Sequence, residues 1–174
     1  MKKILLTILL SFLSYPAFSQ EIANLFIEKF NNDDNLEIIS IGKKMFQVME
    51  SVSLDNADFN KAIKGLEKIV VISSKDSILN NEYYNSAYEI LTKKKNGFEP
   101  LLSTKEGKDD LIVMAKESKG IIKELVLLQG DKSDNFSLIT LCGDIDLKTL
   151  AKYSEKINLS GLKVLNSMNE ENNK

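Results

Sequence analysis

The side chains that most often carry enzymatic chemistry are scarce in this chain. It has no histidine and no tryptophan, and Cys142 is its only cysteine. Without histidine there is no imidazole base, no Ser-His-Asp or Cys-His pair, and no histidine-ligated zinc or haem. Cys142 lies in the apolar run 138–143 with no adjacent lysine. We therefore expect a small buried strand residue there rather than a reactive thiol, and no internal disulfide.

Acidic side chains are the remaining candidates for catalysis or metal binding. The segment 31–37 has oxygen ligands of the kind that calcium prefers, but it lacks the spacing of a calcium-binding loop. Asp109 and Asp110 are expected in a solvated turn, and Asp144 and Asp146 are expected to cap a helix. Two carboxylates brought together by folding would be able to hydrolyse a glycosidic bond, although no motif indicates such a pair. We predict no catalytic, cofactor-binding or metal-ligating residue.

Three tyrosines in one predicted helix form a further candidate site. Tyr83 belongs to the apolar face of that helix, and Tyr84 and Tyr88 flank this face one turn apart. Together they could provide a platform for a ligand. The commoner arrangement, which we expect here, is that such rings cover the edge of a core with their hydroxyls in water.

The charges exclude one class of partner. Every basic residue is lysine, because the chain contains no arginine. Arginine is the side chain that clamps phosphates and carboxylates in a bidentate manner, so tight recognition of planar anions is not expected. Loss of Lys2 and Lys3 with a leader would leave 21 basic against 25 acidic residues, a formal charge of −4. A nucleic-acid partner would instead require a basic face.

The N-terminal segment has the three-part pattern of a secretory signal peptide. Lys2-Lys3 precede the apolar run 4–13, and Ser14-Tyr15-Pro16 and Ala17-Phe18-Ser19 follow it. The run is shorter than the roughly 20 residues that span a bilayer, so we expect a leader of residues 1–19 cleaved after Ser19 and no transmembrane anchor. No cysteine near the cleavage site can carry a lipid. We predict a periplasmic or secreted protein.

The first half of the mature chain mixes helices with short strands. Apolar periodicity predicts the following elements: helices 22–30 and 43–52, a helix beginning near Asp55, a helix at 78–95 capped by Ser77, and strands 36–41 and 69–72. The second predicted helix buries Met45, Met49 and Val52, and the third buries a stripe ending at Leu66. The apolar strand 69–72 is expected to be covered on both faces.

The second half is expected to form an antiparallel meander. Its four strand segments are 98–104, 111–116, 121–129 and 136–142, and the links between them are too short for crossover helices. Pro100 places the first of these strands at an edge or a bulge, and the run Leu125–Leu128 is expected in a central strand. A last helix contains Leu147, Leu150, Ala151 and Ile157, and a polar, frayed tail covers residues 169–174. We predict one α+β domain (residues 20–168), with an antiparallel sheet of about four to six strands and helices packed on one face.

Three stretches resemble landmarks of one protein family: Ile38–Phe46, Ile122–Gly130 and Cys142–Leu147, the last beginning Cys-Gly-Asp-Ile-Asp-Leu. The chain is similar over residues 22–165 to a family of small exported bacterial envelope proteins with a domain of unknown function. The resembling motifs consist of strand, turn and cap residues, so they imply a fold and no active site. The resemblance also implies a periplasmic or envelope-associated protein, in some members encoded near sigma or anti-sigma factors.

From these observations we expect a non-enzymatic protein-interaction or binding module of the cell envelope whose partner is another envelope protein. The family resemblance implies a link to envelope signalling. Two alternatives remain open at this point. A hydrolase would need two acids within about 10 Å in an apolar cleft. A carrier of apolar ligands would need a cavity between sheet and helices. An interaction module would instead show an exposed apolar surface.

Overall fold

The computed structural model describes residues 21–31, 33–52, 57–74, 76, 78–106, 109–131 and 135–149. Its elements in chain order are α2 (Ile22–Lys29), β1 (Glu37–Gly42), α3 (Lys43–Val52), α4 (Ala57–Ile63), β2 (Leu66–Ser74), α5 (Asn80–Thr92), the 3-10 turn η1 (Lys94–Asn96), β3 (Glu99–Glu106), β4 (Asp109–Ser118), β5 (Ile121–Asp131) and β6 (Phe136–Ile145). Several predictions lie outside the described residues: the leader 1–19, the helix start near Asp55, the cap Ser77, the part of the last helix beyond Thr149 and the tail 169–174.

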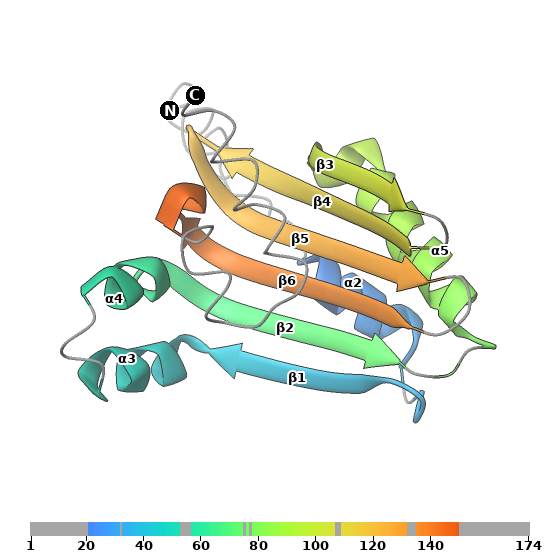
Figure 1. Cartoon of the computed structure of the whole chain (residues 1–174), viewed down its shortest axis with the longest axis horizontal. Helices are drawn as coiled ribbons and strands as arrows, with labels where there is room; N and C mark the ends of the chain where they lie inside the picture. Colours follow the sequence, from blue (N-terminus) through green and yellow to red (C-terminus); the bar gives the residue numbers. More distant parts are fainter. Residues whose placement is uncertain are drawn as a thin grey trace, which may run out of the picture.

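The six strands form one antiparallel sheet in the order β1-β2-β6-β5-β4-β3 (Figure 1). The predicted α+β class and the C-terminal meander are confirmed, since β3 to β6 are neighbours in sequence and in the sheet. The run Leu125–Leu128 is central and buried on both faces, as its lack of alternation indicated. Pro100 lies both in the edge strand β3 and at a bulge, which are the two places where a strand tolerates a missing N–H.

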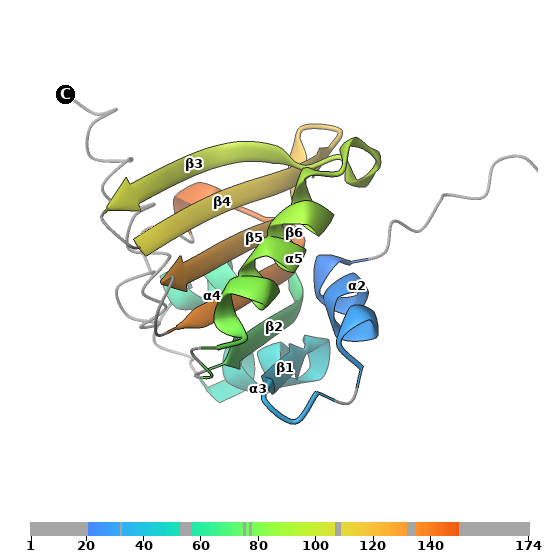
Figure 2. The same cartoon turned by 90° about the vertical axis from the view of Figure 1, so that its right-hand side faces the viewer.

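Helices contact both faces of the sheet, whereas the sequence led us to expect them on one. On the first face, α2 and α5 pack over side chains such as Val70, Val126 and Leu138 (Figure 2). On the second face, Phe46 of α3 and Ile63 of α4 pack with side chains such as Leu127 and Leu141. The prediction missed the second face because α3 and α4 connect β1 to β2 at the end of the sheet. The face that they cover is defined only by the contacts of their buried side chains, which the sequence does not show.

An aromatic cluster fills the space between the sheet and the first pair of helices. Phe26 of α2 is fully buried, and its ring centroid lies 5.4 Å from Phe136, 4.8 Å from Phe30 and 6.4 Å from Tyr83. Tilted, edge-on and offset pairs of this kind each add about 0.5–1.5 kcal/mol beyond the burial of their area. The fold therefore depends on close packing at this interface, and Cys142, the only cysteine, is free.

A close contact between two backbones sets the limits of β2 and β6. The Asp144 N–H donates to the Gly65 carbonyl at 2.8 Å, and a Cβ on Gly65 would lie 2.0 Å from the Asp144 carbonyl oxygen. This contact holds the start of β2 against the end of β6. As a result α4 ends at Ile63 and β6 extends to Ile145. Leu66, predicted as the last buried residue of the helix, is instead the first residue of β2.

The remaining differences concern element ends. The longest helix spans 80–92, shorter than the predicted 78–95, because Asp76 accepts the Ile78 N–H at 2.9 Å in a turn that precedes it. The predicted stop at Asn96-Gly97 is wrong for α5, which ends at Thr92; these residues end the following 3-10 turn η1, where Gly97 is left-handed and the Asn96 side chain donates to the Ile90 carbonyl at 2.6 Å. None of the helices within the described ranges is long and apolar enough to cross a bilayer.

Candidate functional site

Exposed apolar side chains concentrate on β1 and the helix that follows it. Of the nine large apolar side chains that are exposed in the described part of the chain, five lie on these two elements: Ile38, Ile39, Met45, Val48 and Val52. We refer to these five residues as the β1–α3 surface. It occupies one edge of the sheet, opposite β3 (Figure 1). Grouped apolar exposure of this kind is typical of protein-binding surfaces.

β1 is an edge strand without the usual protection. It pairs only with β2 among the described strands, so one row of its N–H and C=O groups faces away from the sheet. Between Glu37 and Lys43 the strand has no charged residue and no proline, and Ile39 is 60% exposed. Sheet edges that must not pair with other chains usually carry lysine, proline or a bulge. The β1 edge is therefore suited to accept a further strand.

The opposite edge of the same sheet has these protective features. β3 contains Pro100, a bulge between Pro100 and Leu102, and Lys105. Proline removes a donor and the bulge interrupts the ladder, so pairing of another strand is disfavoured at the start of β3. The contrast between the two edges shows that the exposure of β1 is not a general property of this sheet.

The apolar face of α3 is rotated from the predicted one. Phe46 is buried and Met49 packs beside it, but Met45 is 50% and Val52 is 75% exposed. The prediction that Met45, Met49 and Val52 share the buried face is wrong for the first and the last. The reason is that α3 follows β1 without a linker and turns its largest side chain, Phe46, toward Ile63 of α4. Met45, Val48 and Val52 are left on the outside.

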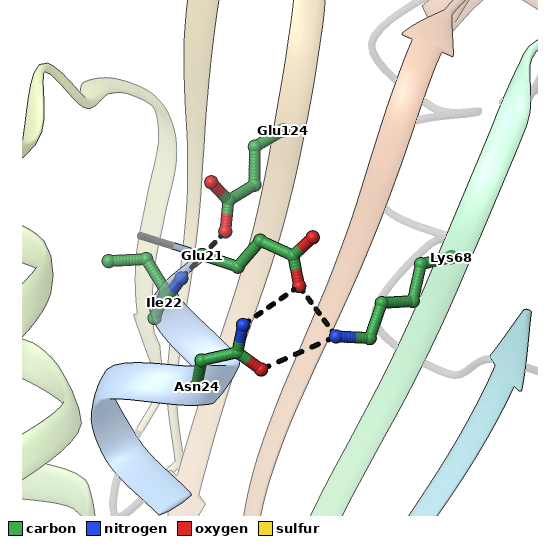
Figure 3. Close-up of polar contacts among 5 residues, drawn as sticks. All are labelled: Glu21, Ile22, Asn24, Lys68 and Glu124. Carbon is green, nitrogen blue, oxygen red and sulfur yellow. Dashed lines mark hydrogen bonds and ion pairs between the residues drawn. The ribbon is translucent and has the colours of Figure 1, made fainter. Parts of the chain in front are cut away.

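A second group of residues surrounds a buried carboxylate at the end of the sheet beneath α2 (Figure 3). Glu124 of β5 is 5% exposed and accepts the N–H of Ile22, the first residue of α2, at 2.8 Å. Burial raises the pKa of the Glu124 carboxyl, and the Ile22 N–H and the charge of Lys116 oppose that shift in part. The carboxylate thus satisfies an N–H that a helix start leaves free.

Glu21 lies beside this group and is held by different partners. Its carboxylate accepts from Lys68 of β2 at 2.6 Å and from the Asn24 side chain at 3.4 Å. Figure 3 shows the Glu124 side chain reaching from its strand toward the start of α2, and the Glu21 side chain extending from that start toward Lys68. The neighbouring hollow of about 350 Å³ is lined by Glu21, Glu67, Lys116, Lys123, Glu124, Cys142, Gly143 and Asp144. Folding has brought carboxylates together, but in a charged hollow instead of an apolar cleft.

The acids singled out in the sequence are mostly occupied by local bonds. Asp33 accepts from its neighbour Asn35 at 3.0 Å and from the Tyr83 hydroxyl at 2.7 Å, and these bonds lower the pKa of the Asp33 carboxyl. Asp146 caps the final helical turn as predicted, accepting the Thr149 N–H and hydroxyl. Asp144 does not cap it, because it still belongs to β6 and pairs with Lys123.

Asp110 is also placed differently from its prediction. It lies in β4 opposite Gly130 of β5, with an 18% exposed side chain, and not in a solvated turn. Cys142 is buried as expected, and burial raises the pKa of its thiol to about 12, so that the reactive thiolate is disfavoured. Of the tyrosines, Tyr83 is fully buried with its hydroxyl on Asp33, contrary to the expectation that the hydroxyl faces water.

No group of three or more cysteine, aspartate and glutamate side chains within the described ranges is arranged to hold a metal ion. The structure thus defines an α+β domain with one open sheet edge among the described strands. The chain belongs to the family described as a domain of unknown function, DUF4252, whose model matches residues 30–153 of 174. Comparison with curated proteins and with solved structures finds no significant match in either set.

Proposed function

We propose that the mature protein is an exported, non-enzymatic interaction module of the cell envelope that binds a partner protein by strand addition at β1. The observation that carries the proposal is the unprotected β1 edge beside the exposed apolar side chains of α3. In strand addition, main-chain hydrogen bonds provide affinity and the alternate side chains provide specificity. The signal-peptide pattern of residues 1–19 supports the envelope as the place of action.

The charges at the two ends of β1 describe the partner. Glu37 lies at the beginning of the strand, and Lys43 and Lys44 follow its end. An antiparallel partner strand would therefore have an acidic residue near its own beginning and a basic residue near its end, with apolar residues between them. We commit to such an extended segment of another envelope protein as the occupant. Self-association through two β1 edges is the competing outcome, since β1 itself has this pattern.

The two alternative functions have less support. A carrier of apolar ligands needs space between sheet and helices, and the aromatic cluster of Phe26, Phe30, Tyr83 and Phe136 fills that region. A hydrolase needs two acids in an apolar cleft, but the hollow beside Glu124 contains lysines, and Lys68 already pairs with Glu21.

The test compares three tagged forms of the mature protein as bait in envelope extracts. These are the wild type, Ile39→Lys, which places a charge on the open edge, and Ile78→Lys, a matched control at an isoleucine that is 86% exposed elsewhere. We expect one protein to be recovered with the wild type and the control and to be lost with Ile39→Lys. Its crosslinked peptide should have the apolar pattern with flanking charges described above.

Two results would overturn the proposal. Equal recovery by wild type and Ile39→Lys would show that β1 is not the binding edge. A dimer of the purified wild type that Ile39→Lys dissociates would show that the edge is occupied by a second copy. N-terminal sequencing of the protein from cells tests the export step separately, since we expect the mature chain to begin at Gln20.

A further inference from the structure

A polar cleft lies between α5 and the strands at the β3 end of the sheet. Two adjoining hollows of about 210 and 290 Å³ share Tyr84, Asn85, Lys105 and Asp110 in their walls. α5 packs against β5 and β6, and beyond them β4 and β3 continue the same sheet face without its cover (Figure 2). The cleft is remote from the β1–α3 surface, which lies at the other edge of the sheet.

Asn80 provides evidence that the cleft receives a polar group. It is the first residue of α5, is 1% exposed and lines the smaller hollow. Neither its side-chain nitrogen nor its oxygen forms a hydrogen bond with any described residue. A buried amide without partners costs about 1–3 kcal/mol, and buried polar groups in native proteins are almost always bonded. A ligand in the hollow would supply the bonds that the protein does not.

Asp110 is a second residue of the walls with a polar atom that lacks a hydrogen bond. Its Oδ1 is buried without a hydrogen bond, and the Lys105 ammonium lies 3.7 Å away from it. Lys105 and Asp110 are the only charged residues in the described walls of the two hollows, and their charges cancel. A neutral ligand is therefore favoured over an anion or a cation.

Two aromatic rings form the outer wall. The rings of Tyr84 and Tyr88 are stacked at 6.5 Å with an angle of 8° between their planes, and Tyr88 is 45% exposed. Tyr84 packs directly on the backbone of β5, since a Cβ on Gly130 would lie 2.4 Å from its Cδ2. Burial, together with the nearby Asp110 charge, raises the pKa of Tyr84 to about 12, so this ring stays neutral. The pair places two parallel aromatic rings, of which Tyr88 is exposed, beside amide and carboxylate groups.

We propose that this cleft binds a neutral saccharide unit, which stacks an apolar C–H face on Tyr84 and Tyr88 and bonds its hydroxyls to Asn80, Asn85 and Asp110. Sugar hydroxyls both donate and accept, which matches amides that do both and a carboxylate that accepts. Aromatic faces carry negative charge density and attract the polarised C–H groups of a sugar ring. Both hollows fall at or below the low end of the roughly 300–1,000 Å³ of typical ligand pockets, which limits the occupant to one or two rings.

The test is a two-dimensional NMR titration of the mature protein with glucose, galactose, mannose and N-acetylglucosamine up to tens of millimolar. Alanine, a zwitterion able to pair with Lys105 and Asp110, is titrated in parallel. We expect at least one sugar to shift amides of residues 80–88 and 103–112 in a saturable manner. A titration in which no sugar shifts these amides, or in which alanine alone shifts them, overturns the proposal.

Variants separate binding from structure. Asn80→Leu removes both unpartnered atoms at similar volume, so we expect unchanged or higher resistance to urea together with about tenfold weaker sugar binding. Tyr88→Ala should weaken binding to a similar degree, whereas Tyr88→Phe, which keeps the ring, should not. If Asn80→Leu and Tyr88→Ala bind the sugar as the wild type does, the cleft is not the site.

Discussion

The contact between Gly65 and Asp144 allows a sharp prediction about stability. Gly65→Ala introduces a Cβ at 2.0 Å from the Asp144 carbonyl oxygen, about 1.5 Å closer than the roughly 3.5 Å of an optimal nonbonded contact. The obstacle is backbone on both sides, so no side-chain rotation relieves it. The start of β2 and the end of β6 must move apart. Their hydrogen bond of 2.8 Å between Asp144 N–H and Gly65 carbonyl then lengthens or breaks.

The expected cost combines two terms. Overpacking in a closely packed region costs about 1–3 kcal/mol, and the loss of one backbone hydrogen bond costs about 1 kcal/mol net. We therefore expect Gly65→Ala to lower the free energy of unfolding by about 2–4 kcal/mol. The matched control is Gly42→Ala, because a Cβ on Gly42 has no atom within 4 Å and should change stability by no more than about 0.5 kcal/mol.

The assay is urea denaturation of the protein expressed without residues 1–19, monitored by circular dichroism. With an unchanged slope of free energy against urea, a lower midpoint for Gly65→Ala measures the lost stability directly. If Gly65→Ala and Gly42→Ala unfold at the same midpoint as the wild type, the two backbones do not approach each other as closely as described. The reasoning about the ends of β2 and β6 would then fail.

Three further predictions concern the buried polar groups. Because burial raises the pKa of Glu124, the folded state binds its proton more tightly, so this group's contribution to stability decreases as pH rises above the ordinary value of 4.5. Glu124→Gln, which keeps an acceptor for the Ile22 N–H, should be more stable than the wild type in urea at pH 8 but not at pH 4, and equal wild-type and variant stability at both values would contradict this. Tyr83→Phe removes the principal hydrogen bond that lowers the pKa of Asp33, so an NMR titration should show this pKa rising toward 3.8. The free energy of unfolding that Asp33 contributes above pH 3.8, and that is lost on acidification, should then become smaller. An unchanged Asp33 titration would disprove the role of the hydroxyl. Cys142 should react with a thiol reagent at pH 8 only in denaturing urea, since it is 8% exposed with a pKa of about 12, and rapid modification of the native protein would contradict its burial.

The order of strands and helices along the chain was predictable because each element is indicated by residues within it or beside it. Apolar runs such as Leu125–Leu128, the turn at Asn96-Gly97 and the proline in β3 each act within a few residues of their own position. The orientation of α3 was not predictable, because the choice between Phe46 and Met45 as the buried residue depends on Ile63 of another helix. Periodicity defines a helix face only approximately when apolar residues lie on two sides.

The candidate sites depend on contacts between residues far apart in sequence. Glu124 meets Ile22 across 102 positions, and Asp110 approaches Asn80 only because β4 pairs with β5 beneath α5. One signal for Glu124 was present. Neighbouring strand residues point to opposite faces, so in the pair Lys123-Glu124, directly before a run buried on both sides, one charge must lie on the face that α2 and α5 cover. No comparable pattern marks Asn80 or Asp110, each of which has one polar and one apolar neighbour.

The difference between the two sheet edges limits the valency of the molecule. With β3 closed by its proline and bulge and β1 open, a strand can join the sheet at one end only. Filaments require two open edges on every subunit, because each added copy must accept the next. An assembly built through β1 therefore terminates after a single pairing, as a one-to-one complex. The fold permits edge recognition without indefinite growth.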